Sequence, residues 1–308
     1  MCGTQGLRQG LAVAAIAVIV GVAAPASAQT PSGQSPSVPP PDPNPGGLTL
    51  TGSFDAVSTY MFRGIRQNST GIALWPVADF GVALYSGKGS LKSAGVNIGT
   101  WNSLHTGDTG QDGPTGKLWY ESDFYSKLTL GFGGGTSAGV LYTAYTSPNN
   151  AYTTVKEIAF QLAVDDSAHL GKAALKPYAL VAFEFDTDQG VGQADGGAKA
   201  GRYLEFGVAP GYAGSRASLT VPVKVGLSLA NYYELNTGTA DAPVFVDNTF
   251  GYFSLAGLVT VPLGGTTNFG AWNLHGGVEF QALGDTTKAL NGGDGHRVIG
   301  SIGIGFTY

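Results

Sequence analysis

Polar and apolar residues alternate along most of this chain. From Leu48 to Tyr308, near-alternating segments recur, and clusters of Gly, Asn, Asp, Ser and Thr separate them. A period of two residues is typical of β-strands with one apolar and one polar face, and such clusters are typical of turns. We identify about twelve predicted strands, at residues 48–62, 72–86, 91–104, 117–130, 135–146, 153–165, 175–185, 202–213, 218–231, 249–263, 272–283 and 296–308.

The connections between the predicted strands alternate between longer polar loops and mostly shorter turns. Each strand is close to the roughly 9–11 residues that a tilted strand needs to cross a bilayer, and an even number returns both termini to one side. Longer loops are expected outside the cell and shorter turns in the periplasm. We predict outer loops at 63–71, 105–116, 147–152, 186–201, 232–248 and 284–295, and inner turns at 87–90, 131–134, 166–174, 214–217 and 264–271.

The last predicted strand shows the two faces most clearly. One face is apolar and carries Val298, Ile302, Ile304, Phe306 and Tyr308, whereas the other carries Arg297, Ser301, Gly303, Gly305 and Thr307. Alternation by itself does not say which face points outward. A soluble barrel would bury the apolar face, and a membrane barrel would turn it toward lipid.

Composition favours the membrane barrel. Only 12% of the residues are charged, against roughly 25% in typical globular proteins. The mean hydropathy is nevertheless only +0.08, which is low for a helical membrane protein. A chain with a lipid-facing apolar side and a polar interior has this mixture. We therefore predict an all-β fold, a transmembrane antiparallel up-and-down β-barrel of about twelve strands in the outer membrane.

Aromatic residues near the predicted strand ends point the same way. Tyr and Trp rings suit the headgroup level of a bilayer, because one side of the ring is apolar and the other is wet. The final Tyr308 and the apolar face before it resemble the C-terminal assembly signal of outer-membrane proteins, so the assembly machinery is an expected partner. The predicted interfacial rings are Tyr60, Trp101, Trp119, Tyr120, Tyr145, Tyr178, Tyr212, Tyr232, Tyr233, Trp272 and Tyr308.

The N-terminal part of the chain has a different composition. Arg8, the apolar run from Leu11 to Ala24 and the small residues Ala26-Ser27-Ala28 predict a signal peptide at 1–28. The apolar run is shorter than the ~20 residues that a spanning helix needs. Residues 29–47 are rich in proline and predict an unpacked linker, which leaves 48–308 for the barrel. Because the single cysteine, Cys2, leaves with the signal, no disulfide is expected.

The polar face would then line the lumen. Its charged residues must pair with one another or meet water, because an isolated charge in a dry interior is very costly. Acidic residues outnumber basic ones, which favours cations in a pore, while the alternative is that the charges pair into networks that fill the lumen. The predicted inward set is Asp55, Arg63, Asp79, Glu121, Asp123, Lys127, Glu157, Lys176, Glu184, Glu205, Lys224, His275, Glu279 and Arg297.

Other kinds of chemistry have little support in the sequence. The formal net charge of −5 provides no basic stripe for nucleic acid. Some barrels of this size are lipid hydrolases, but His275 and Glu279 lie ~13 Å apart along a strand, out of hydrogen-bond reach. The Gly- and Asp-rich stretches at 107–113, 284–287 and 291–295 lack the spacing of a calcium loop. We expect no catalytic residues, no cofactor and no bound metal.

One segment resembles a known family. Residues 54–67 read FDAVSTYMFRGIRQ, and residues 96–104 read VNIGTWNSL. Together they resemble the start of the barrel in the TorF family, a group of porin-like proteobacterial outer-membrane proteins, with Arg66 where that family often has Ser. The matching residues are Ser58, Tyr60, Phe62, Arg63, Gly64, Gln67, Gly99, Trp101 and Ser103. The resemblance implies an outer-membrane barrel with a transport role and names no substrate.

Arg63 lies where the first predicted strand meets its outer loop, and two roles are open to it. It is either a cation at the pore mouth or a buried arginine that joins interior carboxylates and locks the loop. We favour the second role, because the five donors of a guanidinium suit several inward acids.

The sequence therefore predicts a narrow outer-membrane porin or channel for small polar solutes or ions. It would contact outer-membrane lipids and prefer cations weakly. The alternatives are a structural or adhesive barrel with a plugged lumen and, with less support, an outer-membrane lipid hydrolase. The loops at 186–201 and 232–248 are long enough to bind a partner or to fold inward as a constriction.

Overall fold

The computed structural model describes residues 47–109, 113–185, 199–239, 241–264 and 270–308. The predicted signal peptide at 1–28 and nearly all of the predicted linker at 29–47 lie outside the described residues, as does most of the predicted outer loop at 186–201.

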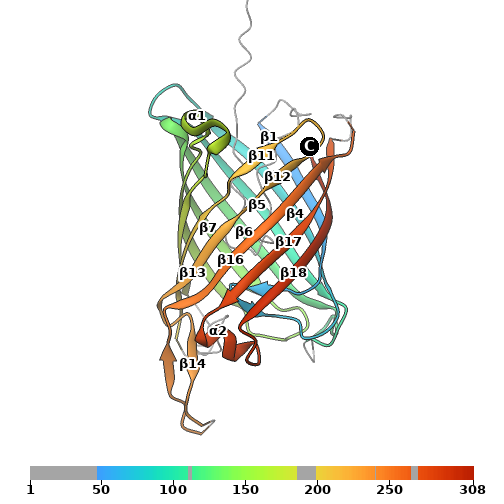
Figure 1. The fold of residues 1–308 in the computed structure, drawn as a ribbon, viewed down its shortest axis with the longest axis vertical. Helices are drawn as coiled ribbons and strands as arrows, with labels where there is room; N and C mark the ends of the chain where they lie inside the picture. Colours follow the sequence, from blue (N-terminus) through green and yellow to red (C-terminus); the bar gives the residue numbers. More distant parts are fainter. Residues whose placement is uncertain (1–46, 110–112, 186–198, 240, 265–269) are drawn as a thin grey trace, which may run out of the picture.

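The described residues form a closed antiparallel β-barrel of 12 strands (Figure 1). Consecutive strands pair around the barrel, and the last strand returns to pair with the first. The predicted fold class is confirmed. The barrel strands are β1 (Leu48–Val57), β4 (Ala73–Ser86), β5 (Leu91–His105), β6 (Trp119–Phe132), β7 (Thr136–Thr146), β8 (Val155–Val164), β9 (Tyr178–Phe185), β10 (Arg202–Val208) with β11 (Gly211–Ala213), β12 (Ser218–Thr220) with β13 (Val223–Ala230), β16 (Phe250–Pro262), β17 (Ala271–Leu283) and β18 (His296–Thr307).

Two of these strands are interrupted by proline. Pro210 separates β10 from β11, and Pro222 separates β12 from β13. Proline has no N–H to donate to a neighbouring strand, so each ladder breaks at that point. The pairing resumes beyond each break, and each interrupted pair corresponds to one predicted strand.

The barrel closes between β1 and β18. Seven residue pairs join them, from Thr51 opposite Thr307 to Val57 opposite Ser301. Leu50 and Tyr308 extend the seam with backbone hydrogen bonds in both directions. The C-terminal strand therefore has a partner on each side and leaves no open edge.

The outer surface of the barrel is apolar. Large hydrophobic side chains are exposed on every second residue of the strands, with Ile302 60%, Leu162 62% and Val278 57% exposed. So much exposed apolar surface would be a liability in water and is the expected lipid-facing band of a transmembrane barrel. The apolar face of the last strand points outward, as that reading requires, because Val298 and Ile304 are also exposed.

The prediction for the aromatic residues is largely wrong. Trp119, Tyr212, Trp272 and Tyr308 are exposed on the outer surface near strand ends. The other rings are not at the lipid surface, because their side chains lie inside the barrel. Those that are buried are Tyr60, Trp101, Tyr120, Tyr145, Tyr232 and Tyr233, and Tyr178 is partly buried on the inner face.

The first predicted strand is also shorter than expected. β1 ends at Val57, and the chain from Ser58 to Ile72 folds back into the barrel. This segment contains the two-residue strands β2 (Met61–Phe62) and β3 (Ile65–Arg66), which pair only with each other. Alternating residues at 58–62 imitate a strand, but Tyr60 and Phe62 are fully buried in the lumen.

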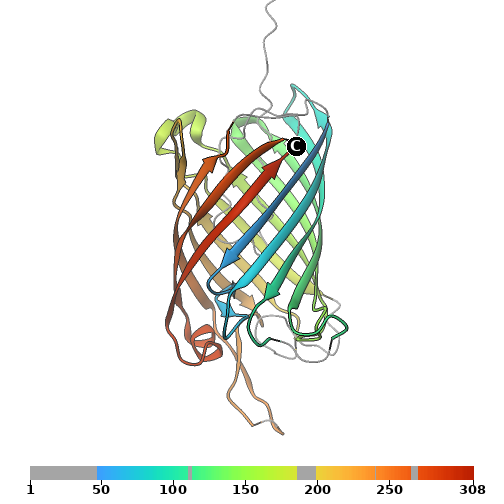
Figure 2. The same cartoon turned by 90° about the vertical axis from the view of Figure 1, so that its right-hand side faces the viewer.

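The ends of the barrel differ as predicted. At the end of the barrel that holds the C-terminus lie three short elements, η1 (Gly133–Gly135), α1 (Ser167–Leu170) and η2 (Gly171–Ala173). At the other end, β14 (Glu234–Asn236) and β15 (Phe245–Asp247) form a hairpin that projects beyond the barrel, beside α2 (Asp285–Leu290) (Figure 2). No helix in the described parts of the chain is long and apolar enough to cross a membrane.

Candidate functional site

The loop between β1 and β4, residues 58–72, enters the lumen near the end of the barrel opposite the C-terminus. It turns sharply at Arg63 and Gly64, whose φ angles are +44° and +86°. Glycine adopts this conformation without strain, and a Cβ on Gly64 would lie 3.0 Å from the Cβ of Tyr252 on β16. We call residues 58–72 the plug loop.

Hydrogen bonds from distant parts of the chain hold the plug loop. The hydroxyl of Tyr233 donates to the carbonyl oxygen of Arg63 at 2.9 Å. Asn291, which follows α2, accepts from the backbone N–H of Arg66 and donates to the carbonyl oxygen of Gly64. Since these contacts join residues about 170 to 227 positions apart, the loop is fixed only once the barrel has closed.

Arg63 makes the strongest single attachment. Its guanidinium donates to both carboxylate oxygens of Glu157 on β8, at 2.7 and 2.9 Å, and to the hydroxyl of Tyr232 at 2.7 Å. It also lies over the ring of Tyr203, 4.1 Å from the centroid. Both charged side chains are almost fully buried. A buried, bidentate ion pair has a defined geometry, and breaking it by removing one partner costs several kcal/mol of stability.

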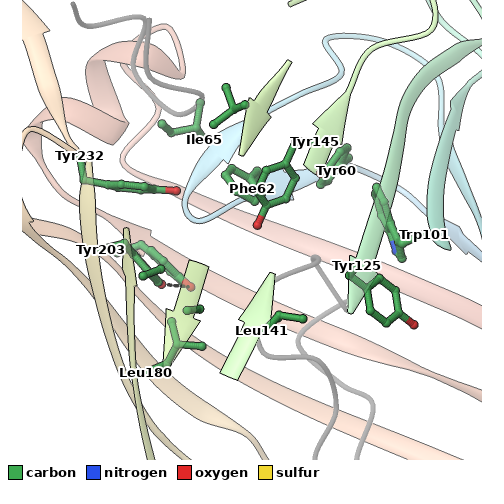
Figure 3. Close-up of a cluster of buried hydrophobic side chains, with 14 of the residues drawn as sticks. Tyr60, Phe62, Ile65, Trp101, Tyr125, Leu141, Tyr145, Leu180, Tyr203 and Tyr232 are labelled. Atoms are coloured by element: carbon green, nitrogen blue, oxygen red, sulfur yellow. Dashed lines mark hydrogen bonds between the residues drawn. The ribbon is translucent and has the colours of Figure 1, made fainter. Parts of the chain in front are cut away.

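Aromatic rings lie around the guanidinium of this ion pair. They belong to the cluster of buried side chains that Figure 3 shows. Phe62 packs edge-on against Tyr145, with ring centroids 5.7 Å apart, and Tyr203 and Tyr232 lie 4.9 Å apart. Tyr60 is packed against Trp101 on β5 at 5.4 Å. These side chains come from the plug loop, three barrel strands and the loop after β13, so they form a core inside the barrel. We call this core, with Arg63 and Glu157, the plug cluster.

The middle of the lumen is more polar and less tightly packed. Asp79 on β4 accepts hydrogen bonds from Asn97 at 2.6 Å and from the hydroxyl of Tyr125 at 2.9 Å. On the facing strands, Lys127 donates to Gln161 at 3.2 Å. Asp79, Asn97 and Gln161 are only half-buried. These residues form a polar band on the inner wall, below the plug cluster.

A second group of charges lies on the strands near the closing seam. His275 bonds Asp55 through Nε2 at 2.5 Å and Asn273 through Nδ1 at 2.8 Å. Farther along β17, Glu279 accepts hydrogen bonds from Ser254 and Gln281. The structure therefore gives His275 the partner Asp55, 220 residues away in the chain, rather than Glu279.

The carboxylate of Glu205 accepts hydrogen bonds from three tyrosine hydroxyls. The hydroxyls of Tyr178, Tyr203 and Tyr252 donate to it at 2.6, 2.6 and 2.8 Å. Lys224 is nearby on β13 and lies over the ring of Tyr252. Because three tyrosine hydroxyls donate to it, the Glu205 carboxylate is held in a fixed position on the inner wall of the barrel.

The remaining predicted inward residues occupy varied positions. Glu121 and Asp123 on β6 are fully buried, and Glu184 is buried near the end of β9, where it accepts from the N–H of Gly201. Two residues lie outside the central lumen. Lys176 is in the turn before β9, and Arg297 pairs with the half-exposed Asp294 in the last outer loop.

Two histidines lie close to serine side chains. His275 bonds Asp55, which also accepts a hydrogen bond from the hydroxyl of Ser53. His105 bonds Ser103 at 2.9 Å, and both side chains are buried, with the His105 ring stacked on Tyr120 and edge-on to Tyr60. Within the described residues, no group of three or more His, Cys, Asp or Glu side chains is arranged to hold a metal ion.

Sequence reasoning missed the residues that hold the plug loop, above all Tyr203, Tyr232, Tyr233 and Asn291. One signal was available in the sequence, since residues 58–67 place two large rings and an arginine in a predicted strand end and loop. Large apolar rings in a loop need a place to be buried, and the lumen is the nearest one.

The chain is distantly similar to several solved structures. No family model and no curated protein sequence matches the chain. Among solved structures it is similar to an outer-membrane channel from Pseudomonas putida F1, at 11% identity over 86% of this chain and 97% of that one, with a TM-score of 0.45.

The chain is also similar to the translocator domain of the autotransporter NalP from Neisseria meningitidis, at 13% identity over 85% of this chain and 89% of that one, with a TM-score of 0.40. The outer membrane phospholipase A from Escherichia coli gives 11% identity over 83% and 92%, with a TM-score of 0.40. These distant likenesses do not distinguish one function from another.

Proposed function

We propose that this chain is an outer-membrane channel for the passive passage of small polar solutes or ions, and not an enzyme. In this proposal the passage is narrow on the extracellular side and weakly prefers cations. The observation that carries it is the contrast between the two faces of the barrel. The outer face is apolar, whereas the inner wall carries half-buried polar side chains such as Asp79, Asn97 and Gln161.

Two further features support the proposal. A water-exposed polar wall inside a lipid-facing barrel is what a solute pathway requires. Acidic groups outnumber basic ones on that wall, and a lumen with excess carboxylates attracts cations. The resemblance of residues 54–67 to the start of TorF-family porins is an independent support from the sequence.

A second function has a specific observation in its favour. The plug cluster is packed like a protein core, with Tyr60, Phe62, Tyr145 and Tyr203 all 0% exposed. A lumen filled in this way suits a structural or adhesive barrel as well as a channel that opens when the plug loop moves. Conductance separates the two.

The test is the current carried by the purified, refolded chain in a planar lipid bilayer under a KCl gradient. We expect small discrete steps with a cation-selective reversal potential. Anion-selective steps would retain the channel and reject the cation preference. Silence from a barrel shown to be intact by its heat-modifiable gel mobility would reject the channel and favour the plugged structural barrel.

A further inference from the structure

Two buried carboxylates on β6 stand apart from the other charges of the lumen. Glu121 and Asp123 are 1% and 0% exposed, and they point inward from the same face of the strand. Because they are two positions apart on one strand, the two side chains are neighbours on that face. Aromatic side chains enclose the pair, with Tyr60 hydrogen-bonded to Glu121 at 2.9 Å and Trp101 directly opposite Asp123 on β5.

The negative charge of this pair has no basic partner among the described residues. The two buried basic residues Arg63 and Lys127 bond to other groups. Arg63 donates to Glu157, and Lys127 donates to Gln161. Two carboxylates in a dry site repel each other and lose their hydration, so they need a proton or a cation between them.

The same place contains several buried oxygen atoms that have no hydrogen-bond partner among the described residues. Within the described residues, no hydrogen-bond partner exists for Oε1 of Glu121, for either carboxylate oxygen of Asp123 or for the hydroxyl of Thr143. Thr143 is 1% exposed on β7, and it lies diagonally across from Asp123, which pairs with Tyr145. Diagonal neighbours on one face of a sheet are within side-chain reach of each other.

We propose that Glu121, Asp123 and Thr143 bind a divalent cation of the calcium class inside the extracellular part of the barrel. The available ligands are all oxygens, which hard cations prefer, and two carboxylates neutralise a charge of +2. Calcium accepts irregular geometry with 6–8 oxygen ligands, whereas magnesium demands a near-ideal octahedron, and two carboxylates from one strand with a hydroxyl from the next do not by themselves supply it.

The cation would have a structural effect that the channel proposal does not include. It would join β6 to β7 beneath the plug loop, because Tyr60 of that loop is bonded to one of the two carboxylates. The inference does not depend on conduction and holds for an open or a closed lumen. Because Tyr60 covers the site, we expect the cation to exchange slowly with solution. The cation is therefore best added while the barrel refolds.

Terbium luminescence tests the site directly. Tb³⁺ replaces calcium at oxygen sites, and Trp101 and Tyr60 are placed to sensitise it when excited near the absorption of aromatic rings. The full chain, refolded with Tb³⁺, is expected to show saturable emission that Ca²⁺ displaces. The Asp123→Asn variant is expected to bind Tb³⁺ at least tenfold more weakly. Heat-modifiable gel mobility shows in each case that the barrel has formed.

Two further variants distinguish a loss of Tb³⁺ binding from a folding defect. Thr143→Val removes only a hydroxyl at nearly constant volume, and a severalfold loss of Tb³⁺ affinity is expected. Glu279→Gln is the matched control, a buried inward carboxylate with hydrogen-bond partners of its own, and it should bind Tb³⁺ like the unmodified chain. Absence of saturable emission would mean that the pair holds only a proton and would overturn the proposal. Equal binding by Asp123→Asn would overturn it too.

Discussion

The plug cluster and the polar band occupy the same lumen but are built differently. In the plug cluster, inward side chains from six parts of the chain pack with almost no exposed surface, and the charges of Arg63 and Glu157 face each other. In the polar band, Asp79, Asn97 and Gln161 remain half-buried. The first region resembles the core of a soluble domain and the second resembles a wetted wall.

The difference shows how one barrel combines stability with a polar interior. The plug loop enters the lumen and supplies two aromatic rings, Tyr60 and Phe62, and the cation of Arg63. Aromatic rings of the barrel wall pack against them. Where the loop does not reach, short polar side chains stay in contact with water at little cost. A barrel of 12 strands, wider than one that its own wall side chains fill, has room for both regions.

The largest expected effect comes from removing the charge at the centre of the plug cluster. Arg63→Met leaves Glu157 buried without its partner, and breaking a buried ion pair costs about 3–5 kcal/mol. We expect the free energy of unfolding in detergent to fall by about that amount and the plug loop to become sensitive to protease. Denaturant unfolding and limited proteolysis measure the two effects.

The double variant Arg63→Met with Glu157→Met sharpens this prediction. Replacing both partners by apolar groups leaves no unpaired charge, so the loss should be clearly smaller than in the single variant. If the two variants unfold alike, the ion pair is not what holds the plug loop.

A medium loss in the free energy of unfolding is expected at the turn of the plug loop. Gly64→Ala forces a side chain into a φ of +86° and against Tyr252, which costs about 1–3 kcal/mol. Gly257→Ala on β16 is the matched control, because a Cβ there meets no atom within 4 Å. Urea unfolding of both variants gives the comparison, and equal losses would show that the turn is not constrained.

A smaller effect on stability, but a direct one on transport, is expected in the polar band. Asp79→Asn keeps the shape and removes one negative charge, so stability should change by about 1 kcal/mol. The cation preference of the conductance should fall, as measured by the reversal potential under a KCl gradient. Asp108→Asn in an exposed outer loop is the control and should leave the reversal potential unchanged. An equal shift in both variants would contradict a role for the band.

The smallest effect on stability is expected at the turn before β9. Backbone N–H groups of Lys176 and Leu175 donate to Asp166 and lower the pKa of its carboxyl group. A lowered pKa in the folded state means that the turn is stabilised above the ordinary Asp pKa of about 3.9 and loses that contribution as the pH falls below it. The amide chemical shifts of Leu175 and Lys176 should report this titration below the ordinary value, and Asp166→Ala should abolish it. A transition at or above the ordinary value would contradict the assignment.

The sequence by itself determined the barrel. The period of two residues located eleven of the twelve strands to within about three positions at each end and overran the first strand by five, because a strand in lipid must satisfy its own backbone and show one apolar face. The same alternation placed Glu121, Glu157, Glu205 and Glu279 on the polar side, where the structure buries them.

Only the tertiary structure decided what the inward residues do. Alternation continues from Ser58 to Phe62, so the sequence could not show that the chain leaves the wall at Val57 and enters the lumen. Nor could it show that Arg63 meets Glu157, 94 residues away. Contacts across a lumen depend on how many strands close the cylinder and how far they tilt, and these are properties of the whole barrel.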